Sequence, residues 1–240
     1  MAAIAVLVLA ACGGGTATQP TPAPSPTPGS LVYAAVGASD TVGVGATDPA
    51  HDAWPAVFAR AALPTARYRN FGISGERVAG ALVDELPKVL NVKPAVVTVW
   101  LNVNDITAGV PVAEYQAQLT ELVHALRQGG TARVLVANTP YLDRLPVYVS
   151  CRTSGTANGV ACPGRATTLA PDAVNALVDS YNVAIAAMAR QEGADLVDLH
   201  AQGEVPDLHP EFVSKDGFHP SSRGYAAVAG AFVARYQQAR

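Results

Sequence analysis

Residues 31–41 read Leu-Val-Tyr-Ala-Ala-Val-Gly-Ala-Ser-Asp-Thr, a short apolar run followed at once by small and polar residues. Further short apolar runs come later in the chain, and longer stretches with helical spacing of apolar residues lie between them. This alternation is typical of an α/β domain built on a parallel sheet. The strands that we expect are Leu31–Val36, Tyr68–Phe71, Ala95–Leu101, Arg133–Ala137 and Asp195–Leu199.

The stretches between these runs predict helices. After Pro111, apolar residues recur three and four positions apart, which indicates a helix with one face on the sheet. Those residues are Tyr115, Leu119, Leu122, Val123 and Leu126. The expected helices are Ala53–Ala62, Gly75–Val89, Val112–Gln128, Pro171–Gln191 and Ser221 to about Gln238. No regular element fits Tyr141–Leu169, so we expect a long functional flap there.

Length and charge narrow the class of protein. The chain has 240 residues, half of them apolar and 15% charged, which suits one domain with a sizeable core. We place that domain at residues 31–240 and expect a monomer. The net charge is −3 and the basic residues are scattered, which argues against a nucleic-acid partner.

The N-terminus predicts an exported protein. Residues 1–11 are almost wholly apolar, too few to span a bilayer and suitable for a signal peptide. The stretch Leu9-Ala10-Ala11-Cys12 resembles the processing box of bacterial lipoproteins, which implies a lipidated Cys12 as the only membrane attachment. No Lys or Arg precedes the apolar stretch, so secretion with an unmodified Cys12 stays open. Residues 12–30 are rich in proline and small polar residues and form a linker.

Two further cysteines lie inside the expected flap. Cys151 and Cys162 stand in a stretch rich in Gly, Ser and Thr, and export would let them oxidise to a disulfide. Two free buried thiols remain an alternative. A zinc site is disfavoured because the loop between the cysteines has no His, Asp or Glu.

Residues able to do chemistry follow three of the expected strands, at the sheet edge where parallel sheets bind ligands. These blocks are Gly37-Ala38-Ser39-Asp40-Thr41, Asn70-Phe71-Gly72-Ile73-Ser74-Gly75 and Asn102-Val103-Asn104-Asp105, and a fourth, Asp216-Gly217-Phe218-His219-Pro220, precedes the last helix. Together, from Val36 to Tyr225, they resemble the SGNH, or GDSL, hydrolase family. The resemblance implies a flavodoxin-like three-layer α/β/α sandwich with a five-stranded parallel sheet, and ester hydrolysis without a metal or other cofactor.

The resemblance also implies a role for each matching residue. Ser39 would be the nucleophile, Asp216 and His219 its triad partners, and Gly75 and Asn104, with the Ser39 N–H, the oxyanion hole. A serine hydroxyl needs an imidazole to accept its proton, and the imidazole needs an acceptor on its other nitrogen. Asp216 stands three residues before His219, so it can bond Nδ1–H and leave Nε2 facing Ser39.

Two positions depart from the family pattern. Ala38 stands where an aspartate usually precedes the serine, and the acid follows instead as Asp40. Asn102 replaces the glycine that usually opens the third block, and we expect it to keep a glycine-like, left-handed backbone.

Other interpretations use the same residues. Ser39 could be a turn residue or helix cap, and Asn104-Asp105 could form an Asx turn. His200, Asp207 and His209 lie near Asp216 and His219 in the sequence, which leaves open a metal site, and His209 is the rival base.

The expected function is hydrolysis of carboxylic esters with short acyl, carbohydrate or lipid groups, through an acyl-enzyme intermediate. Two alternatives stay open. One is acyl transfer to a sugar, and the other is a non-catalytic surface lipoprotein that binds a glycan. We expect the protein to be exported, as a cell-surface or periplasmic lipoprotein or in secreted form.

Overall fold

The computed structural model describes residues 31–157, 160–162, 168–201 and 209–238. The expected signal peptide, the linker with Cys12, and Asp207 lie outside the described residues. Within them, no helix is long and apolar enough to cross a membrane.

Five parallel strands form the central sheet in the order β2-β1-β3-β4-β7. They are β1 (Val32–Gly37), β2 (Arg67–Asn70), β3 (Val96–Trp100), β4 (Arg133–Ala137) and β7 (Asp195–Val197). Counted along the chain, the order is 2-1-3-4-5, the flavodoxin-like order. The five-stranded parallel sheet inferred from the sequence is therefore confirmed. β1 runs from its amino end near Leu31 toward Ser39. The described chain therefore starts at the amino ends of the strands, and Ser39 lies at the carboxyl ends.

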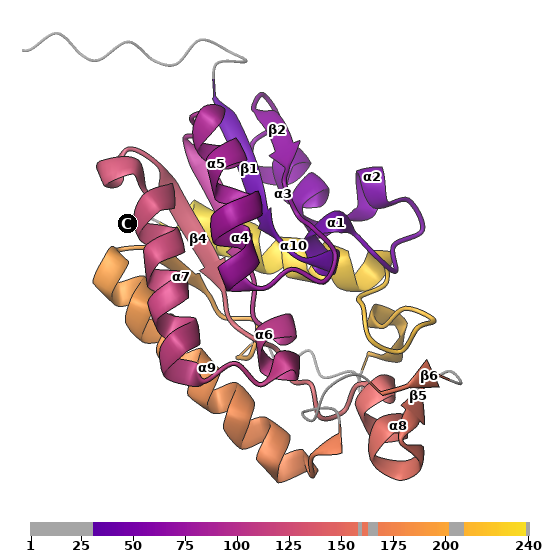
Figure 1. Ribbon diagram of the computed structural model, residues 1–240. Helices are drawn as coiled ribbons and strands as arrows, with labels where there is room; N and C mark the ends of the chain where they lie inside the picture. Colours follow the sequence, from indigo (N-terminus) through magenta and orange to yellow (C-terminus); the bar gives the residue numbers. More distant parts are fainter. Residues whose placement is uncertain (1–30, 158–159, 163–167, 202–208, 239–240) are drawn as a thin grey trace, which may run out of the picture.

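Helices cover both faces of the sheet (Figure 1). Side chains alternate along a strand, so Ala34 and Val36 of β1 pack on one side and Tyr33 and Ala35 on the other. The first face is covered by α4 (Val78–Asp84), α5 (Leu86–Asn91), α7 (Val112–Leu126) and α9 (Pro171–Glu192), and the second by α3 (Trp54–Ala62) and α10 (Ser222–Gln237). The apolar face expected for the helix after Pro111 is confirmed, since all of its residues are fully buried in α7.

The single helix expected over Gly75–Val89 is wrong, because α4 and α5 meet at Glu85. Pro87 has no N–H to continue the hydrogen-bonding pattern of α4. At the break, the fully buried Glu85 accepts a hydrogen bond from the Gly37 N–H at 3.0 Å through one oxygen of its carboxyl group. The break therefore places an acid behind the strand that leads to Ser39.

This buried acid makes stability depend on pH. Burial raises the pKa of Glu85 to about 8, so the folded protein keeps a proton that the unfolded chain releases at lower pH. The resulting stabilisation is complete in acid and is lost as the pH rises toward 8. Glu85→Gln keeps an oxygen acceptor for Gly37 and has no proton to lose. We expect it to gain roughly 2–4 kcal/mol of stability relative to wild type between pH 5 and pH 8.

Calorimetric melting of both proteins at pH 5, 6.5 and 8 measures this difference. The Tm of wild type should fall by roughly 5 °C or more relative to that of Glu85→Gln over this range. If the two melting temperatures change in parallel, the proton on Glu85 is not the cause.

Tyr141–Leu169 contains regular structure, so the expectation that no element fits there is wrong. It holds α8 (Pro146–Ser154) and a hairpin of β5 (Thr156–Ala157) and β6 (Val160–Ala161). The helix begins with a proline and ends before Gly155, whose φ of 68° is left-handed. Much of α8 consists of Ser, Thr and Val, which have low helix propensity. Neither propensity nor the spacing of apolar residues therefore predicts a helix there.

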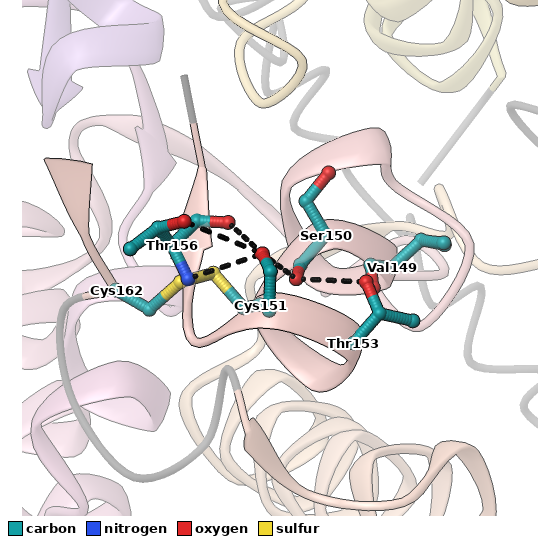
Figure 2. The surroundings of a disulfide bond; sticks show 7 residues. Val149, Ser150, Cys151, Thr153, Thr156 and Cys162 are labelled. Carbon is teal, nitrogen blue, oxygen red and sulfur yellow. Dashed lines mark hydrogen bonds between the residues drawn. A yellow bond between two sulfur atoms is a disulfide. The ribbon is translucent and has the colours of Figure 1, made fainter. Parts of the chain in front are cut away.

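A disulfide joins α8 to the segment after the hairpin. Cys151 and Cys162 are bonded, with Cα atoms 5.8 Å apart (Figure 2). The Ser154 hydroxyl of the last turn of α8 donates to the carbonyl of Thr156 at 2.8 Å. The helix and the hairpin are therefore tied together by a covalent bond and a hydrogen bond.

The remaining helices each span one or two turns: α1 (Ser39–Val42), α2 (Pro49–Asp52) and α6 (Val103–Ala108). Segments this short do not show a helical period in the sequence. Two of them, α1 and α6, begin at or just before residues of the expected site.

Candidate active site

The strand order reverses between β1 and β3, and in sheets of this kind the carboxyl ends at such a point form a ligand crevice. Ser39 begins α1 directly after β1. The Ile73 N–H of the second block donates to the carbonyl of Gly37 at 2.9 Å. The Asn104 side chain of the third block donates to the carbonyl of Glu76 at 2.8 Å. These bonds hold the first three blocks together at one edge of the sheet.

The fourth block reaches the same place through His219. Its Nε2 lies 2.9 Å from the Oγ of Ser39, and its Nδ1 lies 2.6 Å from Oδ2 of Asp216. An ionised carboxylate can only accept, so Nδ1 carries the hydrogen and a neutral ring leaves Nε2 to accept the proton of Ser39. The arrangement suits a nucleophile, a base and a residue that orients the base.

Asp216 is held by a tight loop. Its Oδ1 accepts the Ser214 hydroxyl at 2.8 Å and the backbone N–H groups of Phe218 and His219 at 2.8 and 2.9 Å. Partial burial opposes ionisation, but these bonds and the contact with His219 hold the pKa of Asp216 below its usual range. Asp216 is therefore a carboxylate at neutral pH. Sequence reasoning missed Ser214, whose position in the loop depends on the pairing of Val213 with Pro220.

The turn that carries Ser39 requires close packing. A Cβ on Gly37 would lie 2.8 Å from the carbonyl oxygen of Trp100, so only glycine fits. Asn70, the last residue of β2, donates to the carbonyl of Thr41 at 2.6 Å and accepts the N–H of Gly72 at 3.0 Å. Sequence reasoning placed Asn70 at the start of the second block but assigned it no role. The helix-cap interpretation of Ser39 is wrong, because Ala38 occupies the N-cap position.

Hydrogen-bond donors face the same edge. In the described part of the chain, the N–H groups of Ser39 and Gly75 donate no hydrogen bond. Gly75 has a left-handed φ of 83°, which favours glycine. The Asn104 amide uses one hydrogen on Glu76 and has a second one to donate. Asn104 lies inside α6, so the Asx-turn interpretation is wrong.

The expected left-handed backbone at Asn102 is also wrong. Its φ of −162° lies outside the left-handed region, so this position does not have the positive φ that favours glycine. The buried Asn102 side chain donates to the carbonyl of Ala137 at 3.4 Å, which links the ends of β3 and β4. Asn102, the residue before α6, thus ties the start of this helix to the end of β4.

A cavity of about 350 Å³ opens beside these residues. Asp40, next to Ser39, and Phe218 and Pro220, on either side of His219, line it at the site. The loop after β4 and one face of α10 supply most of the other lining residues, and Asp40 is the only charged residue among those described. Burial raises the pKa of Asp40, and the attraction of His219 only partly opposes this.

The residues of the alternative metal site are held elsewhere. His200 stacks on Tyr141, with ring centroids 4.0 Å apart, and His209 stacks on Phe212 at 4.7 Å. Among the described residues, no group of three His, Cys, Asp or Glu side chains is close enough to hold a metal ion. Asp207 lies outside them. Of the two candidate bases, His219 is the one hydrogen-bonded to Ser39.

The disulfide-bonded α8 contacts the loop from Ser214 to Pro220, called the catalytic loop below because it carries Asp216 and His219. The Val147 N–H donates to the carbonyl of Gly217 at 3.0 Å, and Gly217 has a left-handed φ of 76°.

Removing the disulfide with Cys151→Ser/Cys162→Ser should lower the free energy of unfolding by roughly 3 kcal/mol, because the unfolded chain regains conformational freedom. Urea unfolding with and without dithiothreitol measures this. Wild type should respond to the reductant and the double variant should not, whereas equal stabilities would contradict a contribution from the bond.

The family model for the GDSL-like lipase/acylhydrolase family matches residues 35–227. Among solved structures, the lipase/acylhydrolase from Enterococcus faecalis shares 19% identity, covering 87% of this chain and 100% of that one, with a TM-score of 0.63. An extracellular lipase from Streptomyces rimosus shares 22% identity over 84% of this chain and 99% of its own, with a TM-score of 0.59.

A two-domain esterase active on acetylated mannans shares 19% identity over 88% of this chain and 52% of its own, with a TM-score of 0.54. At these identities the structures show a shared fold. No curated protein sequence matches the chain.

Proposed function

Because the chain belongs to the GDSL-like lipase/acylhydrolase family and is a hydrolase of ester bonds, we propose that Ser39 forms an acyl-enzyme with carboxylic esters. One observation carries this proposal: His219 is hydrogen-bonded through Nε2 to Ser39 at 2.9 Å and through Nδ1 to Asp216 at 2.6 Å. A surface lipoprotein that only bound a glycan would have no need of this arrangement. Acyl transfer to a sugar would use the same residues, with a sugar hydroxyl in place of water.

The first half of the reaction acylates Ser39. Its Oγ attacks the ester carbonyl while its proton moves to Nε2 of His219, and the Asp216 carboxylate stabilises the imidazolium that forms. The carbonyl oxygen becomes an oxyanion, to which the N–H groups of Ser39 and Gly75 and the free amide hydrogen of Asn104 donate. The bond to the alcohol then breaks, and the leaving oxygen takes the proton from Nε2.

The second half releases the acid. A water molecule gives a proton to Nε2 of His219 and attacks the acyl carbonyl on Ser39. The same donors bind the second oxyanion. When the Ser39–acyl bond breaks, Nε2 returns the proton to Oγ, so the enzyme ends as it began.

Labelling with a fluorophosphonate tests the nucleophile without a choice of substrate. The reagent should form one phosphonyl adduct, which peptide mass spectrometry should place on Ser39. Ser74→Ala, which removes an exposed serine of the second block, should label at the wild-type rate. An adduct on another residue, or none, would overturn the assignment of Ser39.

We propose further that residues 31–240 form the catalytic domain of an exported protein, tethered through a lipidated Cys12. The apolar residues 1–11, the lipoprotein-like stretch before Cys12 and the bonded pair Cys151–Cys162 support this. Palmitate incorporation that persists in Cys12→Ser would contradict the lipid anchor.

A further inference from the structure

The cavity extends away from the reacting residues along α10. Its lining on this helix runs from Gly224, close to the catalytic loop, to the exposed Ala234. Ten residues of α-helix span about 15 Å. The residues between them that face the cavity are Ala227, Val228, Gly230 and Ala231. Small side chains at helical spacing thus make α10 the floor of an elongated space.

The residues that line the cavity outside α10 are mostly apolar too. Leu142 and Leu145, from the segment after β4, line it together with Leu199 and Phe218. A sugar in this space would leave hydroxyl groups without partners, which costs free energy. An alkyl chain needs no partners, and each methylene that it buries raises affinity by roughly a factor of four.

The volume of the cavity limits the length of the alkyl chain that it can hold. A volume of about 350 Å³ lies at the lower end of the range for small-molecule sites. A methylene group is close in volume to a water molecule, roughly 30 Å³ in the liquid. The cavity therefore has room for a chain of about ten carbons.

We infer that this cavity binds an unbranched aliphatic chain of roughly eight to ten carbons on the ester, lying along α10 with its ester group at Ser39. The inference rests on the proposed function, because that function places the ester carbonyl at Ser39. Asp40, which follows Ser39 in the sequence, lines the cavity, and the polar ester group would lie beside it.

Two neighbouring alanines allow a matched test. Ala227 lines the cavity, whereas Ala226 is exposed and does not. Ala227→Phe should fill the space of about three methylenes. We expect it to lower kcat/KM for p-nitrophenyl octanoate roughly 50-fold and to change the acetate ester by less than threefold. Ala226→Phe should leave both esters within twofold of wild type.

Two further measurements show which part of the ester enters the cavity and provide a second variant. Octyl acetate compared with ethyl acetate shows whether the alcohol, rather than the acyl group, enters the cavity. Ala234→Phe places a ring at the exposed end of the cavity and should lower kcat/KM only for decanoyl and longer esters. It replaces Ala227→Phe as the test variant if Ala227→Phe does not fold. Equal effects of Ala227→Phe on short and long esters of both series, or no effect on any, would overturn the inference.

A binding measurement separates this inference from the proposed function. Dansyl-undecanoic acid should bind the wild-type protein at least tenfold more tightly than Ala227→Phe, and equally to Ala226→Phe. If no ester is hydrolysed, the proposed function fails, yet this difference in binding would still support the cavity as an alkyl-chain site. Equal binding to all three proteins would overturn it.

Discussion

Replacing Ser39 with alanine is expected to reduce kcat for p-nitrophenyl butyrate by a factor of about 10⁴ or more. Without Oγ no acyl-enzyme can form, and only the oxyanion donors and binding remain to help water attack. The fold should be unaffected, because the hydroxyl of Ser39 is hydrogen-bonded to His219 and does not cap a helix.

The measurement compares steady-state rates and melting curves for wild type, Ser39→Ala and Ser74→Ala. Ser74→Ala removes a hydroxyl from the same edge of the sheet and should keep full activity. A Ser39→Ala protein that melts normally and retains more than about a tenth of wild-type kcat would remove Ser39 from the mechanism.

Replacing His219 with alanine should cost nearly as much, again about 10⁴-fold in kcat. Ser39 would lose the acceptor of its proton, and Asp216 would keep its charge with no imidazole to orient. Added imidazole should restore part of the activity, since the substitution opens space at the position of the ring. Such rescue distinguishes a missing base from a disturbed fold.

His209→Ala and His200→Ala are the matched controls for this prediction. Both side chains stack on aromatic rings, on Phe212 and Tyr141, and neither is bonded to Ser39. We expect kcat within threefold of wild type for both. If His209→Ala instead loses activity as His219→Ala is expected to, and imidazole rescues only His209→Ala, then His209 is the base.

Most of the sheet could be predicted from the sequence because four of its strands, β1, β3, β4 and β7, are largely buried. Each of these four contains a short apolar run, whereas the edge strand β2 reads Arg-Tyr-Arg-Asn and is mostly exposed. The observed strand ends differ from the expected ones by at most two residues, as at β7. The break at Glu85 and the helix α8 were missed for local reasons. Pro87 indicates the break, and Pro146 and Gly155 lie at the distance expected for the two ends of a helix. Helix propensity and the periodicity of apolar residues nevertheless predicted neither feature.

The residues of the candidate site were named from motif blocks, whereas the hydrogen bonds that hold these blocks in place were not predicted. Glu85 reaches Gly37 across 48 positions, and Asn70 reaches Thr41 across 29. Asp105, whose pKa burial raises to about 6, accepts the N–H of Val78 in the same way. Such bonds depend on how loops meet in space, and neither periodicity nor spacing in one sequence contains that information.

The direction of β1 determines which way the site faces. Its six residues extend about 20 Å, from the amino end of the sheet near Leu31 to the turn that carries Ser39. Anything attached through residues 1–30 therefore joins the domain on the side remote from the reacting groups. A tether at this end would therefore leave the opening beside Ser39 unobstructed, and molecules from the surroundings could enter without passing the point of attachment.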